Sequence, residues 1–528
     1  MKNKIFKIIA VAGLITGTFS ACTKKLDLLP TNDVTSETVY KTYAGYKQGF
    51  AKVYASYAQT GDNGPASSYF SGFDPGTTDF FRLFFKAQVL STDEAVLAWG
   101  DPGLQDFHKM NWSANNPMIF LLYSRSLYQI TLANEFIRQS ADAKLSARGI
   151  SGADADNVKK FRTEARFLRA FQYWVLMDVF GNPPLVTDAD AIGGAPPKQI
   201  KRADLFVFIE NELKAIEPDM AAPKTNEYGR ADKAAVWALL ARMYLNAGVY
   251  TGTTRYTDAI TYAKKVIAEP YTLVSDYRWL MLADNHQNTN EFILTINYDG
   301  VKAQTYGGTT FLTHASVGGT MSGSNYGING GWFGLRTTKG LVNKFPDNSG
   351  LTDKRAQFYQ AGQNLEINDL TKFEDGFAVT KFRNVSRTGV PGQNQEFMDV
   401  DMPLFRLGEM YLIYAEAVLR NGTGGDATTA LGYVNALRTR AFGNTSGNII
   451  ASQLTLDFIL DERARELYWE GHRRTDLIRY DRFVEGTYLW PWKGAVSGGA
   501  AVDPKYKLYP IPSDDLSANP NLVQNPGY

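Results

Sequence analysis

The sequence predicts a mainly α-helical protein in which antiparallel helix pairs form a scaffold that carries a loop-rich, mixed insertion. Two observations support this fold class. Several long segments repeat apolar residues every three to four positions, as amphipathic helices do. By contrast, the stretch 307–334 contains nine glycines among Ser, Thr and Asn, which excludes long helices there. With 44% hydrophobic and 21% charged residues, the 528-residue chain has a globular composition.

The N-terminus has the order of segments found in an export signal. Lysines within positions 2–7 precede an apolar run over 8–19, and Ser20 and Ala21 stand directly before Cys22. The apolar run is too short to span a bilayer. We predict that 1–21 is a lipoprotein signal peptide and that acyl chains on Cys22 anchor the protein to a membrane. The alternative is an ordinary signal followed by a free or buried cysteine.

Three long amphipathic helices are expected in the N-terminal part, over 38–59, 117–139 and 158–180. The third ends at Gly181, which can adopt the left-handed conformation, and the prolines after it cannot continue a helix. Between the first and second helices, prolines and glycines predict a loop segment over 61–115.

Helix pairs are expected further along the chain. Residues 231–246 and 256–268 flank a Gly-Val-Tyr-Thr-Gly turn, and their alanines allow close packing against bulky partners. The C-terminal region repeats the design with 403–420, 427–441 and a third helix over 456–470. These look like interrupted tetratricopeptide-type pairs, although generic antiparallel helices explain each pair equally well.

The segment 271–402 differs from the helical regions on both sides. Residues 291–297 (EFILTIN) predict a strand, and glycine-rich loops follow. Loops on a rigid scaffold commonly carry recognition residues. We therefore predict one unit over 22–528, consisting of an N-terminal helical part (22–270), this loop-rich part, and a C-terminal helical part ending in an irregular tail (403–528).

The sequence offers no catalytic motif. It lacks a Gly-x-Ser-x-Gly elbow, a His-Glu-x-x-His pair and a phosphate-binding Gly-Lys-Ser/Thr loop. Asp93 and Glu94, which follow Ser91-Thr92, are interpreted as first-turn residues of a short helix. Because paired carboxylates leave no short motif, a glycosidase stays an open alternative.

Charge and metal-ligand content exclude further classes. The net charge is +1 and no block of Lys or Arg stands out, so no nucleic-acid partner is expected. The chain has four histidines, and a histidine metal site would need distant residues to converge. Asp188 and Asp190 resemble the start of a calcium loop, but Ile192 and Gln199 occupy ligand positions.

Several stretches carry a family resemblance. FRTEARFLRAFQYWVLMDVFGNPPLVT, YGRADKAAVWALLARMYLNAGVYTG, DMPLFRLGEMYLIYAEAVLR, ERARELYWEGHRRTDLIRYDRF and YPIPSDDLSANPNLVQNPGY resemble the SusD/RagB family of Bacteroidetes outer-membrane lipoproteins. The resemblance covers essentially the whole chain. It implies a mainly helical fold, no enzymatic activity, no cofactor, and a glycan site in the loop-rich part. It also implies a location on the outer membrane facing the cell exterior, and a SusC-like TonB-dependent transporter as partner.

The resemblance is strongest to the starch-binding member of the family and implies site residues. Trp99, Tyr306 and Trp332 match the positions of an aromatic arc in that protein. This residue type suits sugars, because an aromatic face can cover the C–H face of a sugar ring. The simpler interpretations are a core residue for Trp99 and loop anchors for Tyr306 and Trp332.

Polar partners for the arc are implied in the same way. Asp74 and Arg82 match a carboxylate and a fork of donors able to bridge sugar hydroxyls, and Asp101 stands close to an asparagine of the starch-binding member. Arg82 lies beside phenylalanines, so a cation–π role is its alternative. An acid-rich loop of that member is reduced here to Asp284 before Glu291, so we predict no calcium or other metal.

The prediction from sequence is thus a surface lipoprotein that captures starch-type α-glucan oligosaccharides for a transporter. Alternatives are a binding protein for a different glycan, a surface glycoside hydrolase, or a structural lid without sugar affinity.

Overall fold

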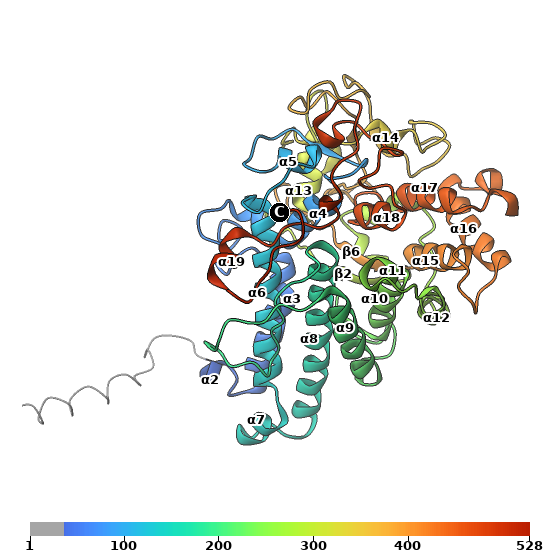
Figure 1. The fold of residues 1–528 in the computed structure, drawn as a ribbon. Helices are drawn as coiled ribbons and strands as arrows, with labels where there is room; N and C mark the ends of the chain where they lie inside the picture. The colour runs from blue at the N-terminus through green and yellow to red at the C-terminus, as the bar shows by residue number, and fades with distance from the viewer. Residues whose placement is uncertain (1–35) are drawn as a thin grey trace, which may run out of the picture.

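The computed structural model describes residues 36–528 (Figure 1), so the predicted signal peptide and Cys22 lie outside the described residues. Within this range the chain is mainly helical, with the helices gathered on one side and long irregular segments of 271–402 on the other (Figure 1). No helix in the described range is long and apolar enough to cross a membrane.

The longer helices account for most of the regular structure. They are α3 (Tyr43–Ala58), α4 (Phe80–Gln88), α6 (Pro117–Gln139), α8 (Gly152–Val179), α9 (Arg202–Ile216), α10 (Lys233–Leu245), α12 (Tyr256–Ile267), α13 (Gly308–Ala315), α15 (Leu407–Leu419), α16 (Ala427–Phe442) and α17 (Leu456–Leu467). The shorter ones are α2 (Ser36–Val39), α5 (Gln105–Lys109), α7 (Asp142–Ala147), α11 (Ala247–Thr251), α14 (Lys339–Val342), α18 (Arg473–Arg479) and α19 (Ser513–Ala518).

The predicted N-terminal helices are confirmed as α3, α6 and α8. The first begins later than expected, because the chain turns after α2 and Thr42 caps α3 by accepting a hydrogen bond from the Gly45 N–H at 3.2 Å. Asn116 caps α6 directly before Pro117, which favours the first helical position. Helices α3 and α8 pack through aromatic contacts such as the stacked rings of Phe50 and Phe161, whose centroids lie 4.5 Å apart.

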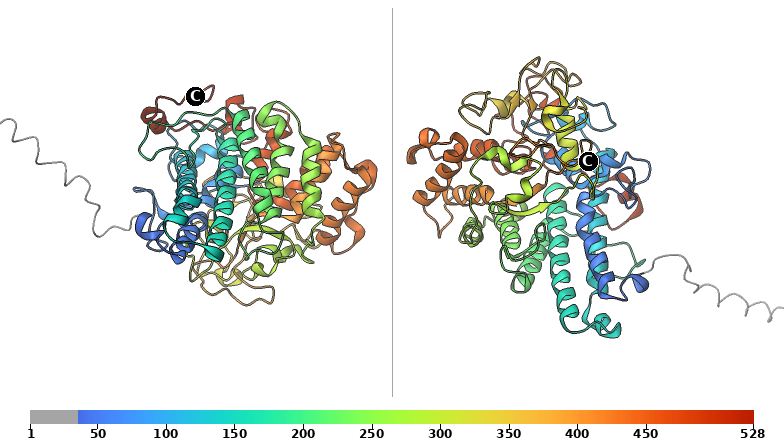
Figure 2. Two further views of the ribbon diagram at one scale, coloured as in Figure 1. Left: turned by 90° about the horizontal axis from the view of Figure 1, so that it is seen from below. Right: turned by 180° about the vertical axis from the view of Figure 1, so that it is seen from behind.

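A row of helices lies side by side from α8 through α10 and α12 to α15 and α16 (Figure 2). The predicted pair 231–246 and 256–268 is confirmed as α10 and α12. The alanines of α10 are fully buried, as close helix packing requires. Charged groups also join the row, because the buried Arg242 guanidinium donates to both carboxylate oxygens of Glu409 on α15 at 2.7 Å.

Residues 36–528 contain three two-stranded antiparallel sheets, each with at least one strand in the loop-rich part. They pair β1 (Val96–Leu97) with β3 (Leu335–Arg336), β2 (Phe292–Ile296) with β6 (Met402–Arg406), and β4 (Phe358–Tyr359) with β5 (Ala378–Val379). The strand predicted over 291–297 is confirmed as β2. The helix predicted from residue 403 is wrong at its start, because 403–406 extend to pair with β2 before α15 begins.

Other predictions are corrected by packing that local pattern does not show. Residues 80–88, expected in a loop segment, form the fully buried helix α4, which Asp79 caps. Asp93 and Glu94 do not begin a helix. Asp93 forms a buried two-bond ion pair with Arg473 at 2.7 Å, and Glu94 accepts the Trp469 N–H at 3.0 Å. The tail expected to be irregular contains α19.

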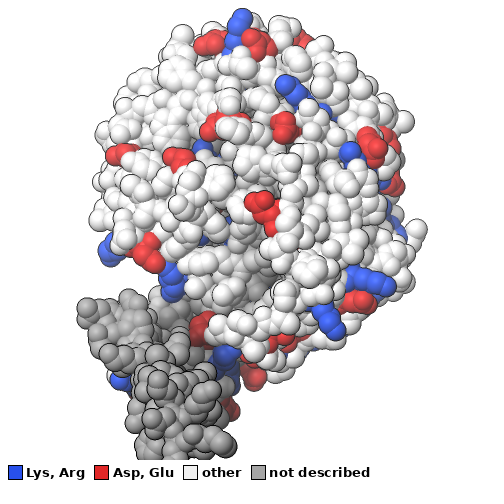
Figure 3. Space-filling model, turned by 60° about the vertical axis from the view of Figure 1, so that its left-hand side comes forward, with Lys and Arg blue, Asp and Glu red and all other residues white. Residues whose placement is uncertain are grey.

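Surface charge is evenly mixed on the face shown in Figure 3. Basic and acidic residues are interspersed there without a large patch of one sign. This distribution agrees with the net charge of +1 and provides no field that would attract a polyanion to this face.

Candidate functional site

The structure brings Trp99, Tyr306 and Trp332 together at the loop-rich side of the molecule. The ring centroids of Trp99 and Trp332 lie 6.3 Å apart with planes tilted by 45°. Those of Tyr306 and Trp332 lie 6.5 Å apart and tilt by 47°. All three side chains are partly exposed. The rings therefore form a curved series, here called the aromatic arc, with Trp332 at its centre.

The β1–β3 pair places the two tryptophans of the arc. Val96 pairs with Arg336 and Leu97 with Leu335, so Trp99 after β1 meets Trp332 before β3. The Trp99 indole N–H donates to the Trp332 carbonyl at 3.0 Å. Gly334 is needed in this arrangement, because a Cβ there would lie 2.8 Å from the Trp99 ring.

Tyr306 stands just before α13 and is fixed from both ends. A Cβ on Gly76 would lie 2.6 Å from the Cβ of Tyr306, so the turn that contains Gly76 packs directly on the Tyr306 backbone. At the other end, the Tyr306 hydroxyl donates to the Glu396 carboxylate at 2.6 Å. That hydrogen bond to Glu396 raises the pKa of Tyr306.

Arg82 lies beneath the arc and supports it. Its side chain is 7% exposed, and its guanidinium carbon lies 4.5 Å from the centre of the Phe311 ring and 5.5 Å from that of Trp99. Its Nη1 donates to the Tyr306 carbonyl at 3.3 Å. The alternative foreseen from sequence, a cation–π residue, is thus present in the structure together with the position beside the arc.

Two carboxylates stand above Arg82. Asp74 is 67% exposed, lies 4.0 Å from the Arg82 guanidinium, and accepts the Thr77 N–H at 3.0 Å. Asp101 is exposed in the turn after Trp99. Burial lowers the pKa of Arg82, whereas the negative charges of Asp74 and Asp101 act to raise it. Asp74 therefore lies beside the Arg82 guanidinium that supports the arc, and Asp101 is placed by the chain next to Trp99.

Sequence reasoning missed three neighbours of the arc. His314 stacks on Trp332 with centroids 4.6 Å apart and planes at 18°, and its ring nitrogens contact the carbonyls of Gly330 and Glu396. In the sequence, His314 stands out only as a residue type that binds metals. Glu396, the partner of Tyr306, carried no sequence signal. Phe333 is 51% exposed and has a left-handed φ of 53°, which is uncommon outside glycine.

Asp284 and Glu291, which stand where the starch-binding member of the family has an acid-rich loop, both pair with residues of this chain. Asp284 accepts a hydrogen bond from the Arg387 Nε at 2.8 Å. Glu291 pairs with Arg406 and Arg440 at 3.1 Å and 3.0 Å. Among residues 36–528, no three His, Cys, Asp or Glu side chains are placed to hold a metal ion.

Chemically, the arc is an open surface of ring faces with a hydrogen-bonding rim. Ring faces suit the C–H faces of sugars, and the exposed Asp74 carboxylate beside them can accept hydrogen bonds from sugar hydroxyls. The planes of neighbouring rings are tilted by 45° and 47°, so the three rings do not form one flat platform, and they suit a ligand whose successive units also turn relative to one another.

Comparison with known proteins finds relatives along the chain. A model described as the SusD family matches residues 352–528. The chain is 36% identical to the starch-binding protein SusD of Bacteroides thetaiotaomicron over a 581-residue alignment that covers 100% of both proteins. It is 24% identical to a SusD-like protein of Bacteroides ovatus over 400 residues, covering 72% of this chain and 69% of that protein.

Solved structures share the fold. A SusD superfamily protein from Parabacteroides distasonis superimposes with a TM-score of 0.70 at 21% identity, covering 94% of this chain and 100% of the other. Surface glycan-binding protein A from Bacteroides thetaiotaomicron, solved in complex with laminarihexaose, gives a TM-score of 0.68 at 21% identity, covering 91% and 98%. On the strength of the full-length similarity at 36% identity, the chain belongs to the SusD family.

Proposed function

We propose that the protein binds starch-type α-glucan oligosaccharides on the aromatic arc, with Asp74, Arg82 and Asp101 as polar partners. The observation that carries the proposal is the series of three partly exposed rings whose planes are tilted relative to one another. An α-1,4-linked glucan coils, so successive glucose rings turn relative to one another and can follow a curved surface. The full-length relative named as a starch-binding protein supports the same ligand class.

The polar residues fit a supporting role. The exposed Asp74 accepts hydrogen bonds from sugar hydroxyls, whereas the buried Arg82 holds the Tyr306 backbone and sets the charge under the ring faces. Asp101 is exposed two residues after Trp99. The ligand contacts therefore come mainly from ring faces, with few directed hydrogen bonds.

Affinity electrophoresis against a polysaccharide panel tests the ligand class. Starch, amylopectin and glycogen should retard the protein, whereas laminarin and cellulose derivatives should not. Retardation by laminarin alone would assign the arc to a different glycan, a relevant alternative because a relative of similar fold was solved with laminarihexaose.

We further propose that the protein binds glycans without cleaving them. The absence of a catalytic motif and the membership of a family of binding proteins support this. Incubation with starch or maltooligosaccharides should release no reducing ends above buffer. Release by a preparation freed of contaminating amylase would favour the glycoside hydrolase alternative.

For its place in the cell, we propose a lipid anchor at Cys22 on the outer membrane, facing outward, and delivery of glycans to a SusC-like TonB-dependent transporter. The leader that ends at Cys22 and the family resemblance support this arrangement. Copurification of the transporter with the affinity-tagged lipoprotein from solubilised outer membranes tests it. Recovery without any such transporter would contradict it.

A further inference from the structure

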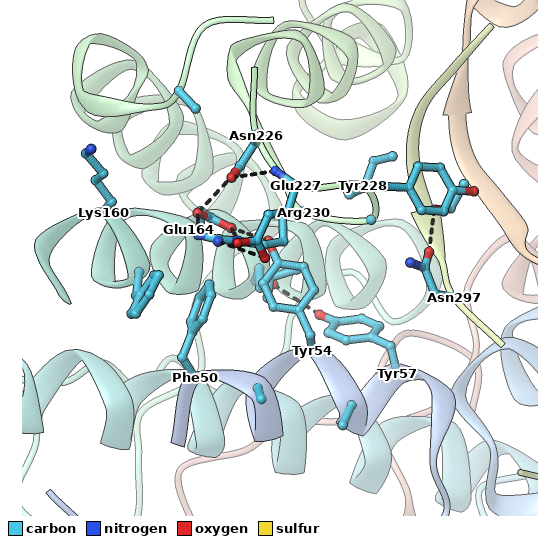
Figure 4. Close-up of a pocket in the computed structure, with 18 of the residues that line it drawn as sticks. Phe50, Tyr54, Tyr57, Lys160, Glu164, Asn226, Glu227, Tyr228, Arg230 and Asn297 are labelled. Atoms are coloured by element: carbon cyan, nitrogen blue, oxygen red, sulfur yellow. Dashed lines mark hydrogen bonds and ion pairs between the residues drawn. The ribbon is translucent and has the colours of Figure 1, made fainter. Parts of the chain in front are cut away.

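A second concave site lies apart from the aromatic arc. A cavity of about 780 Å³ opens where α3, α8, the loop 219–230 and β2 meet (Figure 4). No residue of the arc lines it. Its size falls within the ~300–1,000 Å³ range of small-molecule sites. Exposed lining residues such as Lys47, Lys160 and Asn297 show that it is open to solvent.

The charged groups at its centre neutralise one another. Glu164 of α8 accepts hydrogen bonds from Arg230 at 2.5 Å, Tyr54 at 2.8 Å and Asn226 at 3.2 Å (Figure 4). Arg230 in turn lies 5.1 Å from the centre of the Phe50 ring. The centre of the cavity thus presents charges that are already paired with each other, whereas the exposed Lys47, Lys160 and Asp219 stand at its rim.

The cavity walls combine aromatic rings with side-chain amide groups that have donor or acceptor atoms left unpaired within residues 36–528. The Tyr43 ring stacks on Phe161 with centroids 6.3 Å apart and planes at 15°. The side-chain amides of Gln59 and Asn157 have no hydrogen-bond partner within residues 36–528, and the Asn297 Nδ2 likewise lacks one among these described residues. Aromatic faces and free amides at one site are the groups that recognise neutral polyhydroxylated molecules.

The cavity wall that carries Asn297 is tightly packed. Gly229 has a φ of +79°, and a Cβ on it would lie 2.2 Å from the Asn297 Nδ2. The neighbouring Tyr228 hydroxyl donates to the buried Asp401 at 2.7 Å, which fastens the loop 219–230 to the segment before β6. The loop and β2 therefore hold the amide in a fixed position at the mouth of the cavity.

From this arrangement we propose that the cavity is a second carbohydrate site, which binds a short neutral oligosaccharide independently of the aromatic arc. The enclosed volume suits a few sugar rings, not a long chain. A peptide segment is the less favoured occupant, because the carboxylate and guanidinium at the centre are already paired with each other and leave only exposed rim residues to hold a charged group. The proposal goes beyond the glycan capture proposed above and does not depend on it.

The test isolates the cavity by removing the arc. A chain carrying Trp99→Ala and Trp332→Ala is titrated calorimetrically with maltotriose, cellotriose and laminaritriose. We expect at least one trisaccharide to bind saturably in the millimolar range or more tightly. Adding Ala51→Trp, which places a bulky ring on an exposed residue that lines the cavity, should weaken that binding at least tenfold. The matched control Ala44→Trp is exposed on the same helix outside the cavity and should not.

A second measurement avoids the double variant. Hydroxyl-radical footprinting of the otherwise unmodified protein should show protection of Tyr54 and Tyr228 by the same trisaccharide, and no protection in Ala51→Trp. The proposal is overturned if no trisaccharide binds the arc-deficient chain or protects these tyrosines. It is equally overturned if Ala51→Trp binds as well as Ala44→Trp. Either failure leaves starch binding by the arc intact, whereas loss of starch binding alone would remove only the function proposed for the arc.

Discussion

Replacing Trp332 by alanine should separate ligand binding from folding. Trp332 is the central ring of the arc, and its backbone is held independently of its side chain, because its N–H donates to the His314 carbonyl at 2.8 Å. Its carbonyl accepts from Trp99 at 3.0 Å. Truncation therefore removes a ring face without releasing the loop. A stacked aromatic anchor is worth about 1 to 3 kcal/mol of binding, so we expect α-glucan affinity to fall roughly 5- to 150-fold.

The expected cost in stability is smaller than for a core tryptophan. Trp332 is partly exposed and loses chiefly its contacts with His314 and Trp99, so we expect about 1 to 2 kcal/mol. The fully buried Trp469 should instead cost about 3 to 5 kcal/mol when truncated.

The assay is calorimetric titration with maltoheptaose together with urea unfolding of each variant. A matched control is Trp237→Ala on α10, because that tryptophan is also partly buried and lies in the helical row. It should lose stability and keep its affinity for α-glucan. If Trp332→Ala kept full affinity, or lost affinity only in proportion to unfolding, the arc would not be the binding surface.

Further predictions concern the framework and the anchor. Arg473→Met should lower the free energy of unfolding by about 3 kcal/mol, because it removes the two-bond partner of the buried Asp93 carboxylate and leaves it the Tyr488 hydroxyl at 2.6 Å and Lys344 at 3.9 Å, and the double variant with Asp93→Asn should recover part of that loss. Urea unfolding measures both, and a single variant as stable as the wild type would contradict the reasoning. Burial raises the pKa of Asp401 to about 7, so the native state holds this proton more tightly than the unfolded chain and the contribution to stability declines as pH rises from about 4 through about 7. The stability of the wild type relative to Asp401→Asn should therefore fall between about pH 4 and about pH 7 and level off above that, and a difference constant with pH would refute this. Finally, Cys22→Ala should release the protein from the outer-membrane fraction, and its unchanged retention on immunoblots of fractionated cells would end the lipoprotein interpretation.

Helices were predictable where a long segment had one apolar face. The α6 boundaries follow from Asn116 and Pro117 at one end and from the end of the apolar repeat at the other. The start of α15 was not predictable, because 403–406 are as apolar as the helix that follows. Their extended conformation depends on β2, more than a hundred residues away in sequence. Such non-local pairing overrides local preference.

The family resemblance predicted the positions of the three rings. It did not predict how other residues hold those rings in place. Nothing local indicates that Arg82 is buried, because α4 lies in a stretch rich in turn residues and is enclosed by distant elements. The stacking of His314 on Trp332 likewise depends on the turn that brings 330–334 back onto α13. The roles of supporting residues therefore emerge only from tertiary structure.

The way the arc is held together bears on how its specificity can change. Its three rings come from different segments, and hydrogen bonds to backbone groups fix each segment. Ala98 N–H donates to the Gly334 carbonyl at 3.0 Å, Gly334 N–H to the Ala315 carbonyl at 2.8 Å, and Arg82 to the Tyr306 carbonyl at 3.3 Å. Backbone contacts do not depend on which side chain stands at Trp332 or Tyr306. Substitutions at these rings should therefore alter which glycan binds without changing the backbone conformation of the loops. The residues that determine specificity are thus separate from those that determine the fold.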